Sequence, residues 1–75
     1  MADVNDTDAM HALAVANEAV IAASQERHRI QREIDNLPKR AVLRRRQLGA
    51  DLVAATAVWL TEVSIQERMF RRAYP

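Results

Sequence analysis

The apolar positions in the second half of the chain recur at spacings of three and four residues, which place them in rows along the sides of a helix. The rows contain Leu48, Leu52, Val53, Trp59, Leu60 and Val63. Between Leu52 and Leu60 the only residue that is not apolar is Thr56. Since a helix that is apolar on almost all sides is normally buried, this stretch predicts a core helix with Trp59 as its central aromatic side chain.

The first half of the chain carries a narrower apolar seam, with the alternating three and four spacing of an antiparallel hairpin or coiled coil. The seam positions are Leu13, Ala16, Val20, Ala23, Arg27, Ile30, Ile34 and Leu37. Arg27 is the one charged residue among them, and two interpretations remain open. Its stem packs while its charge reaches solvent, or it makes a buried polar contact that fixes the register between subunits.

The predicted fold is an all-α antiparallel hairpin with helices over about 7–36 and 38–72. Residues Asn5 to Thr7 are all good N-caps, so residues 1–6 are expected to be a flexible acidic tail before a single domain over 7–75. Pro38 cannot sit inside a helix but suits a first helical position, which predicts a tight turn there. Gly49 leaves an alternative: the second helix breaks or kinks, or it is continuous and Gly49 lets a neighbour approach closely.

A chain of 75 residues builds only a small core and usually needs further stabilisation. It has no cysteine and only two histidines, which excludes disulfides and makes a structural zinc improbable. Self-association or a partner protein would supply that stabilisation, and we expect a homodimer that forms a four-helix bundle. The residues expected in the core or at the dimer interface are Leu13, Val20, Arg27, Ile30, Ile34, Leu48, Leu52, Val53, Trp59, Leu60 and Val63.

Charge is unevenly distributed although the whole chain carries only +1. The net charge is −5 over residues 1–26, +6 over residues 27–46 and zero over residues 47–75. Two hairpins with their bends at opposite ends would place each basic bend beside an acidic half, so charge favours an antiparallel dimer. Lys39 and Arg40 would lie in the first turn of the second helix, against the helix dipole.

Arginines near the bend and an arginine-aromatic C-terminus are the candidate partner-binding residues, because such side chains are typical of binding hot spots. They are Arg40, Arg44, Arg45, Arg46, Arg68, Phe70, Arg71, Arg72 and Tyr74. Alternatively, the aromatic pair covers the open end of the core, and the basic patch is a solvated surface.

The sequence contains no motif for catalysis, so we expect neither an enzyme nor a cofactor. The only glycine is Gly49, which rules out a glycine-rich phosphate loop. The N-terminus has no basic segment followed by an apolar one, which predicts a cytoplasmic protein. A membrane span is not expected, because the longest charge-free run of this stretch, 52–61, is about half of the roughly 20 residues required.

The leading hypothesis is a protein-interaction module, a small homodimeric regulator or inhibitor that covers a surface of a target protein. The alternative is a helical dimer that binds RNA or DNA through the basic patch. This layout is similar to that of the small plasmid copy-number regulators that bind RNA as dimers of helical hairpins, although no motif residue corresponds. A third hypothesis is a structural component of a larger assembly, in which a different protein would cover the second helix.

Overall fold

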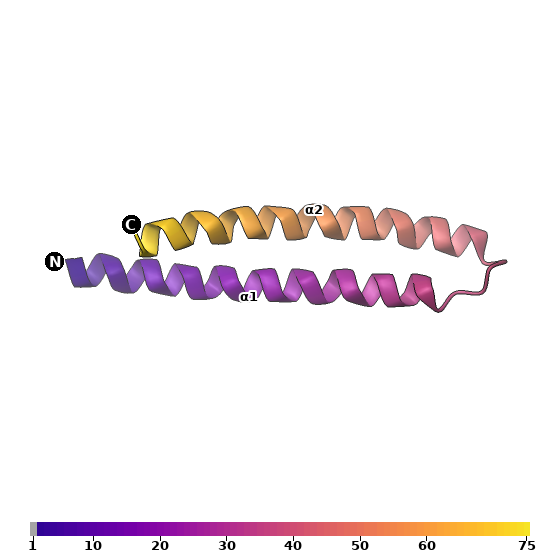
Figure 1. Cartoon of the computed structure of the whole chain (residues 1–75), viewed down its shortest axis with the longest axis horizontal. Coiled ribbons are helices and arrows are strands. Elements are labelled where there is room, and N and C mark those ends of the chain that lie inside the picture. The colour runs from indigo at the N-terminus through magenta and orange to yellow at the C-terminus, as the bar shows by residue number, and fades with distance from the viewer. Residues whose placement is uncertain (1) are drawn as a thin grey trace.

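The chain is a hairpin of two long antiparallel helices (Figure 1). The computed structural model describes the backbone of residues 2–75 and the side chains of residues 7–75. Helix α1 spans Ala2–Asp35 and helix α2 spans Val42–Ala73, with 34 and 32 residues. The molecule measures 62 × 15 × 12 Å. The all-α helical hairpin predicted from the two apolar seams is confirmed.

Helix α1 begins earlier than the capping pattern predicted. Its backbone is helical from Ala2, so Thr7 and Asp8 lie inside the helix and the prediction of an N-cap at residues 5–7 is wrong. No glycine or proline interrupts the chain before Pro38, and acidic residues near a helix start are favoured by its dipole. The side chains of residues 1–6, the predicted flexible tail, lie outside the described part of the chain.

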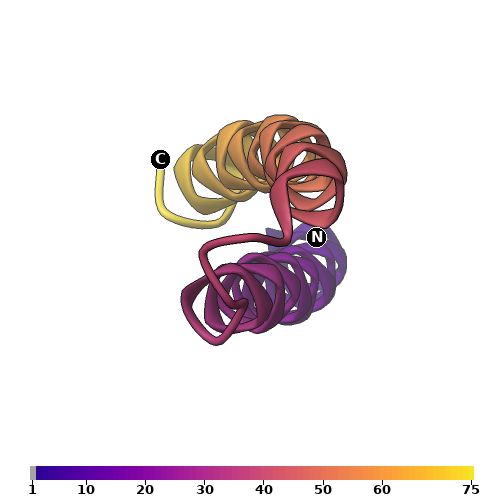
Figure 2. The ribbon, with the colours of Figure 1, turned by 90° about the vertical axis from the view of Figure 1, so that its right-hand side faces the viewer.

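The connection between the helices is longer than the predicted tight turn. It spans residues 36–41 and crosses from the end of α1 to the start of α2 (Figure 2). The carbonyl of Pro38 accepts a hydrogen bond from the backbone N–H of Ala41 (3.0 Å) and one from Nη2 of Arg45 (3.2 Å). This turn delays the start of α2 to Val42. Pro38 is therefore not a first helical position.

The charges at the start of α2 also differ from the prediction. Lys39 and Arg40 lie in the connection, so neither opposes the dipole from the first turn. Arg44 and Arg45 occupy that turn instead, and it contains no acidic residue. Ala41 precedes α2 without a side-chain capping bond.

The core is a single line of side chains between the two helices. Its buried members are Ala9, Leu13, Ala16, Ile30 and Leu48. Val20, Ile34, Leu52, Trp59 and Val63 are half-buried beside them. Val53 and Leu60 lie outside this core, with 71% and 54% of their surface exposed, because one partner helix covers only one side of α2.

Helix α2 continues through Gly49 without a break. A Cβ atom built on Gly49 would meet no atom within 4 Å. The interpretation that Gly49 admits a close neighbour is therefore wrong for contacts within the hairpin.

Candidate partner-binding surfaces

Arg27 links the two helices at the middle of the hairpin. Its Nε donates a hydrogen bond to Oγ1 of Thr56 (3.1 Å), and its guanidinium carbon lies 4.5 Å from the centre of a Trp59 ring. The Thr56 hydroxyl in turn donates to the carbonyl of Leu52 (2.8 Å). This polar contact sets the register of α1 against α2 within one chain. Sequence spacing indicated the unusual position of Arg27 but could not identify Thr56.

A groove opens between the helices at the end opposite the bend. Its volume is about 590 Å³, and its lining consists of Leu13, Asn17, Val63, Gln66, Glu67, Phe70 and Tyr74. The rings of Phe70 and Tyr74 lie 5.0 Å apart and are 54% and 55% exposed. Nε2 of Gln66 donates to Oδ1 of Asn17 (2.7 Å), which ties α2 to α1 beside the groove. We call this the open-end groove.

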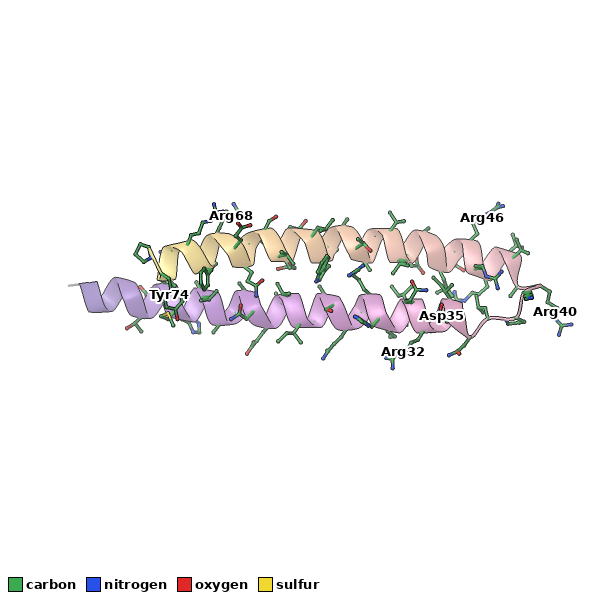
Figure 3. All side chains as sticks on the ribbon, viewed as in Figure 1. Arg32, Asp35, Arg40, Arg46, Arg68 and Tyr74 are labelled. Atoms are coloured by element: carbon green, nitrogen blue, oxygen red, sulfur yellow. The ribbon has the colours of Figure 1, made fainter. Side chains whose placement is uncertain are left out.

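The C-terminal arginines do not all border this groove. Nη2 of Arg71 lies 2.6 Å from Oε1 of Glu67, which lines the groove. Arg68 points away from α1, whereas Tyr74 lies between the helices (Figure 3). The structure therefore brings Phe70 and Tyr74 of the predicted C-terminal set together, connects Arg71 to the groove through Glu67, and separates Arg68 from them.

The predicted basic bend is also divided. Arg40 points outward from the tip of the connection, and Arg46 points away from α1 on α2 (Figure 3). Arg45 is half-buried and bonded to the Pro38 carbonyl. Consecutive residues on a helix point about 100° apart, so Arg44, Arg45 and Arg46 cannot form one contact surface.

A cleft beside the bend gathers three arginines from both helices. It has a volume of about 520 Å³, and Arg29, Arg32 and Arg44 line it together with Glu33 and Leu48 among others. Arg29 donates to both carboxylate oxygens of Glu26, at 2.9 and 2.6 Å. These hydrogen bonds and the adjacent positive charge lower the pKa of Glu26. Within the described residues, no ion pair involves Arg32 or Arg44, so these two supply the unpaired charge of the cleft.

The side of α2 that faces away from α1 is apolar and exposed. Its members are Ala50, Val53, Ala54, Ala57, Leu60 and Thr61, and we call them the outer α2 face. The alanines and Thr61 recur at alternating spacings of four and three, the pattern of a coiled-coil seam. The predicted core helix did not distinguish this face from the buried one, although the spacing could have revealed it.

The two histidines and the two serines of the chain lie on helices α1 and α2. No group of three or more His, Cys, Asp or Glu side chains within this range could hold a metal ion. His11 and His28 are both exposed. Ser24 and Ser64 lie on helices, without the sharp turn that activates a nucleophilic serine.

Helix α2 is long and apolar enough to cross a membrane, by length and composition only, with a mean hydropathy of 1.4 over its most apolar stretch. Core helices of soluble proteins are equally long and apolar but mostly buried, whereas only 6% of this stretch of α2 is buried. The hairpin alone therefore leaves this stretch uncovered. A cytoplasmic location without membrane contact stays a prediction.

No protein-family model, curated protein sequence or solved structure matches the chain. The surfaces described above are therefore the basis for any functional conclusion.

Proposed function

We propose that this protein is a non-enzymatic protein-interaction module, a small helical regulator that acts by covering a surface of a target protein. The observation that carries the proposal is the open-end groove, where two adjacent aromatic rings remain about half exposed. Exposed aromatic side chains beside an arginine are typical of the residues that dominate binding energy.

The groove has the chemistry of an anchor site for an apolar side chain. Leu13, Val63 and Phe70 contribute apolar surface, and beside them Nε2 of Gln66 is paired with Oδ1 of Asn17. An apolar group of a target could enter without breaking this hydrogen bond, whose loss would leave a donor and an acceptor unpaired and cost binding energy.

The charge beside the groove indicates the neighbours of that apolar group. Arg71 is exposed and forms an ion pair with Glu67 of its own helix. An acidic side chain on the target could compete for the Arg71 guanidinium, because charge-assisted hydrogen bonds to carboxylates are strong and directional. The proposed target segment therefore presents an apolar side chain next to a carboxylate.

The test is a pull-down from the native host lysate, with and without nuclease, using three baits: the unchanged protein, Phe70→Ala and Val15→Ala. Val15 is an exposed apolar residue of α1 outside the groove lining and serves as the matched control. The proposal expects one stoichiometric protein that survives nuclease, is retained by Val15→Ala and is lost with Phe70→Ala. Equal retention by all three baits would exclude the groove as the contact site.

A second candidate function is nucleic-acid binding at the cleft beside the bend. The supporting observation is that Arg32 and Arg44 line that cleft with no ion pair among the described residues. Binding to nucleic acid should fall steeply as salt increases, and Arg32→Glu with Arg44→Glu should abolish it. A flat salt response or unchanged binding by this double variant would refute this candidate.

A further inference from the structure

The hairpin exposes more surface than a compact protein of its mass. Its accessible surface is 5847 Å² for 8.5 kDa, whereas a compact monomer of this mass exposes about 4,700 Å². The excess from two chains is about 2,300 Å², and a standard stable interface buries about 1,600 Å² in total. The excess is therefore large enough for a dimer interface, and the outer α2 face supplies its apolar part.

We infer that the outer α2 face is occupied by α2 of a second copy of this chain, antiparallel to the first. Arg46, Val53, Leu60 and Glu67 follow one another at intervals of seven residues, so they lie along one edge of this face. A two-fold axis between residues 56 and 57 places Val53 opposite Leu60 of the second copy. The same axis places Arg46 opposite Glu67 of the second copy.

The centre of the face suits such a close contact. Ala50, Ala54 and Ala57 have small side chains and are exposed, so two helices can approach closely along them. The Thr61 hydroxyl donates to the carbonyl of Ala57 (3.0 Å), which satisfies its hydrogen bond and allows the side chain to be buried. Ala57 lies closest to the axis.

Charge determines the orientation of the two copies. Antiparallel packing forms the Arg46–Glu67 pair twice and brings the stem of Arg68 over Leu43 of the second copy, a side chain that is 79% exposed in the hairpin. Arg46 and Arg68 both point away from α1 (Figure 3). Parallel packing would instead place the two Arg68 side chains opposite each other and the two +6 bends together.

This inference changes the arrangement expected for four helices. The outer α2 face is opposite α1, so the two α2 helices meet in the middle and each α1 lies on the outside. The contact lies on a different side of α2 from Phe70 and Tyr74. Glu67 belongs to both surfaces, because it also lines the open-end groove and pairs with Arg71 of its own chain. The two aromatic rings stay accessible in the dimer, so Phe70→Ala tests the groove without altering the dimer contact.

Two single-cysteine variants test the axis, and the chain has no native cysteine to interfere. Ala57→Cys is expected to form a disulfide-linked dimer under mild oxidation, because the two positions meet at the axis. Ala50→Cys is expected not to link, because its two copies are offset by 13 residues, or about 20 Å at the rise of a helix, and a disulfide spans about 6 Å between Cα atoms. Linking of both variants would refute the antiparallel orientation, and linking of neither would refute the interface.

A charge exchange tests the Arg46–Glu67 pair between the two copies. The molecular mass is measured by sedimentation at a series of protein concentrations. Arg46→Glu and Glu67→Arg should each weaken dimerisation by about tenfold or more, because each turns two attractions into repulsions. The double variant should restore the dimer. In parallel packing, Arg46 faces Asp51 and Glu67 faces Arg72 of the other copy, so the double variant would be weaker than either single change.

Two controls distinguish a second copy of the chain from the other possible occupants of this face, a target protein and a lipid bilayer. Phe70→Ala should leave dimerisation unchanged even though it abolishes target binding in the proposal above. Sedimentation with vesicles of neutral and anionic lipid tests whether a bilayer covers the face instead. A monomer in solution that binds these vesicles, and loses binding when Val53 and Leu60 are changed to Ser, would overturn the inference.

Discussion

Replacing Gly49 with alanine should stabilise the protein. Gly49 lies within the uninterrupted helix α2, and its φ is not positive. A Cβ at this position meets no atom within 4 Å, so the methyl group causes no clash and gains no packing. The remaining effect is the helix preference of alanine over glycine, about 1 kcal/mol in a helix interior.

The assay is thermal unfolding followed by circular dichroism at 222 nm, at one fixed protein concentration because a dimer makes Tm depend on concentration. A change of about 1 kcal/mol corresponds to a rise in Tm of about 4–8 °C for a domain of this size. Ala22→Gly on the exposed side of α1 is the matched control and should lower Tm by a similar amount. A fall in Tm for Gly49→Ala would refute the reasoning and would indicate a helix break, or another chain packed against Gly49.

Three further outcomes follow from the core, the interhelical contact and the exposed ion pair. Leu48→Ala should lower the free energy of unfolding by about 2–4 kcal/mol, because Leu48 is only 2% exposed and its loss leaves a cavity; urea unfolding measures this. Arg27→Met should cost about 1–2 kcal/mol in the same assay, because it keeps the stem but loses the hydrogen bond to Thr56 and the cation–ring contact. An NMR titration should find the Glu26 pKa below its ordinary value and find that Arg29→Gln raises it. Because folding lowers this pKa, the pair contributes stability above the unfolded-state pKa and loses it as pH falls.

The open-end groove illustrates what spacing alone could and could not predict. The sequence indicated that Phe70 and Tyr74 share a side of one helix, since they are four residues apart. It could not indicate that Leu13 and Asn17 complete the lining, because that depends on which turn of α1 lies opposite. The contacts of Arg27 with Thr56 and of Asn17 with Gln66 fix that register, and none of these pairs is close in the chain.

For the arginines, too, one part could be predicted from the sequence and another part depends on the fold. Their number and the +6 balance of residues 27–46 are properties of the sequence. Their directions depend on where α2 begins, and the turn at Pro38 moves that start to Val42. As a result Arg40 lies in the connection, Arg44 lines the cleft and Arg46 lies on the opposite side of α2.

The two helices and their apolar seams could be predicted from the sequence, because helical periodicity is a local property that each turn repeats. The sequence also indicated that α2 has more apolar surface than one partner helix can cover. Which part of that surface stays uncovered depends on the packing of the two helices, because α1 packs against Leu48, Leu52 and Trp59 and leaves Val53 and Leu60 in solvent. The exposed residues of a helix depend on where its neighbour lies, and that position follows from contacts between residues far apart in the chain.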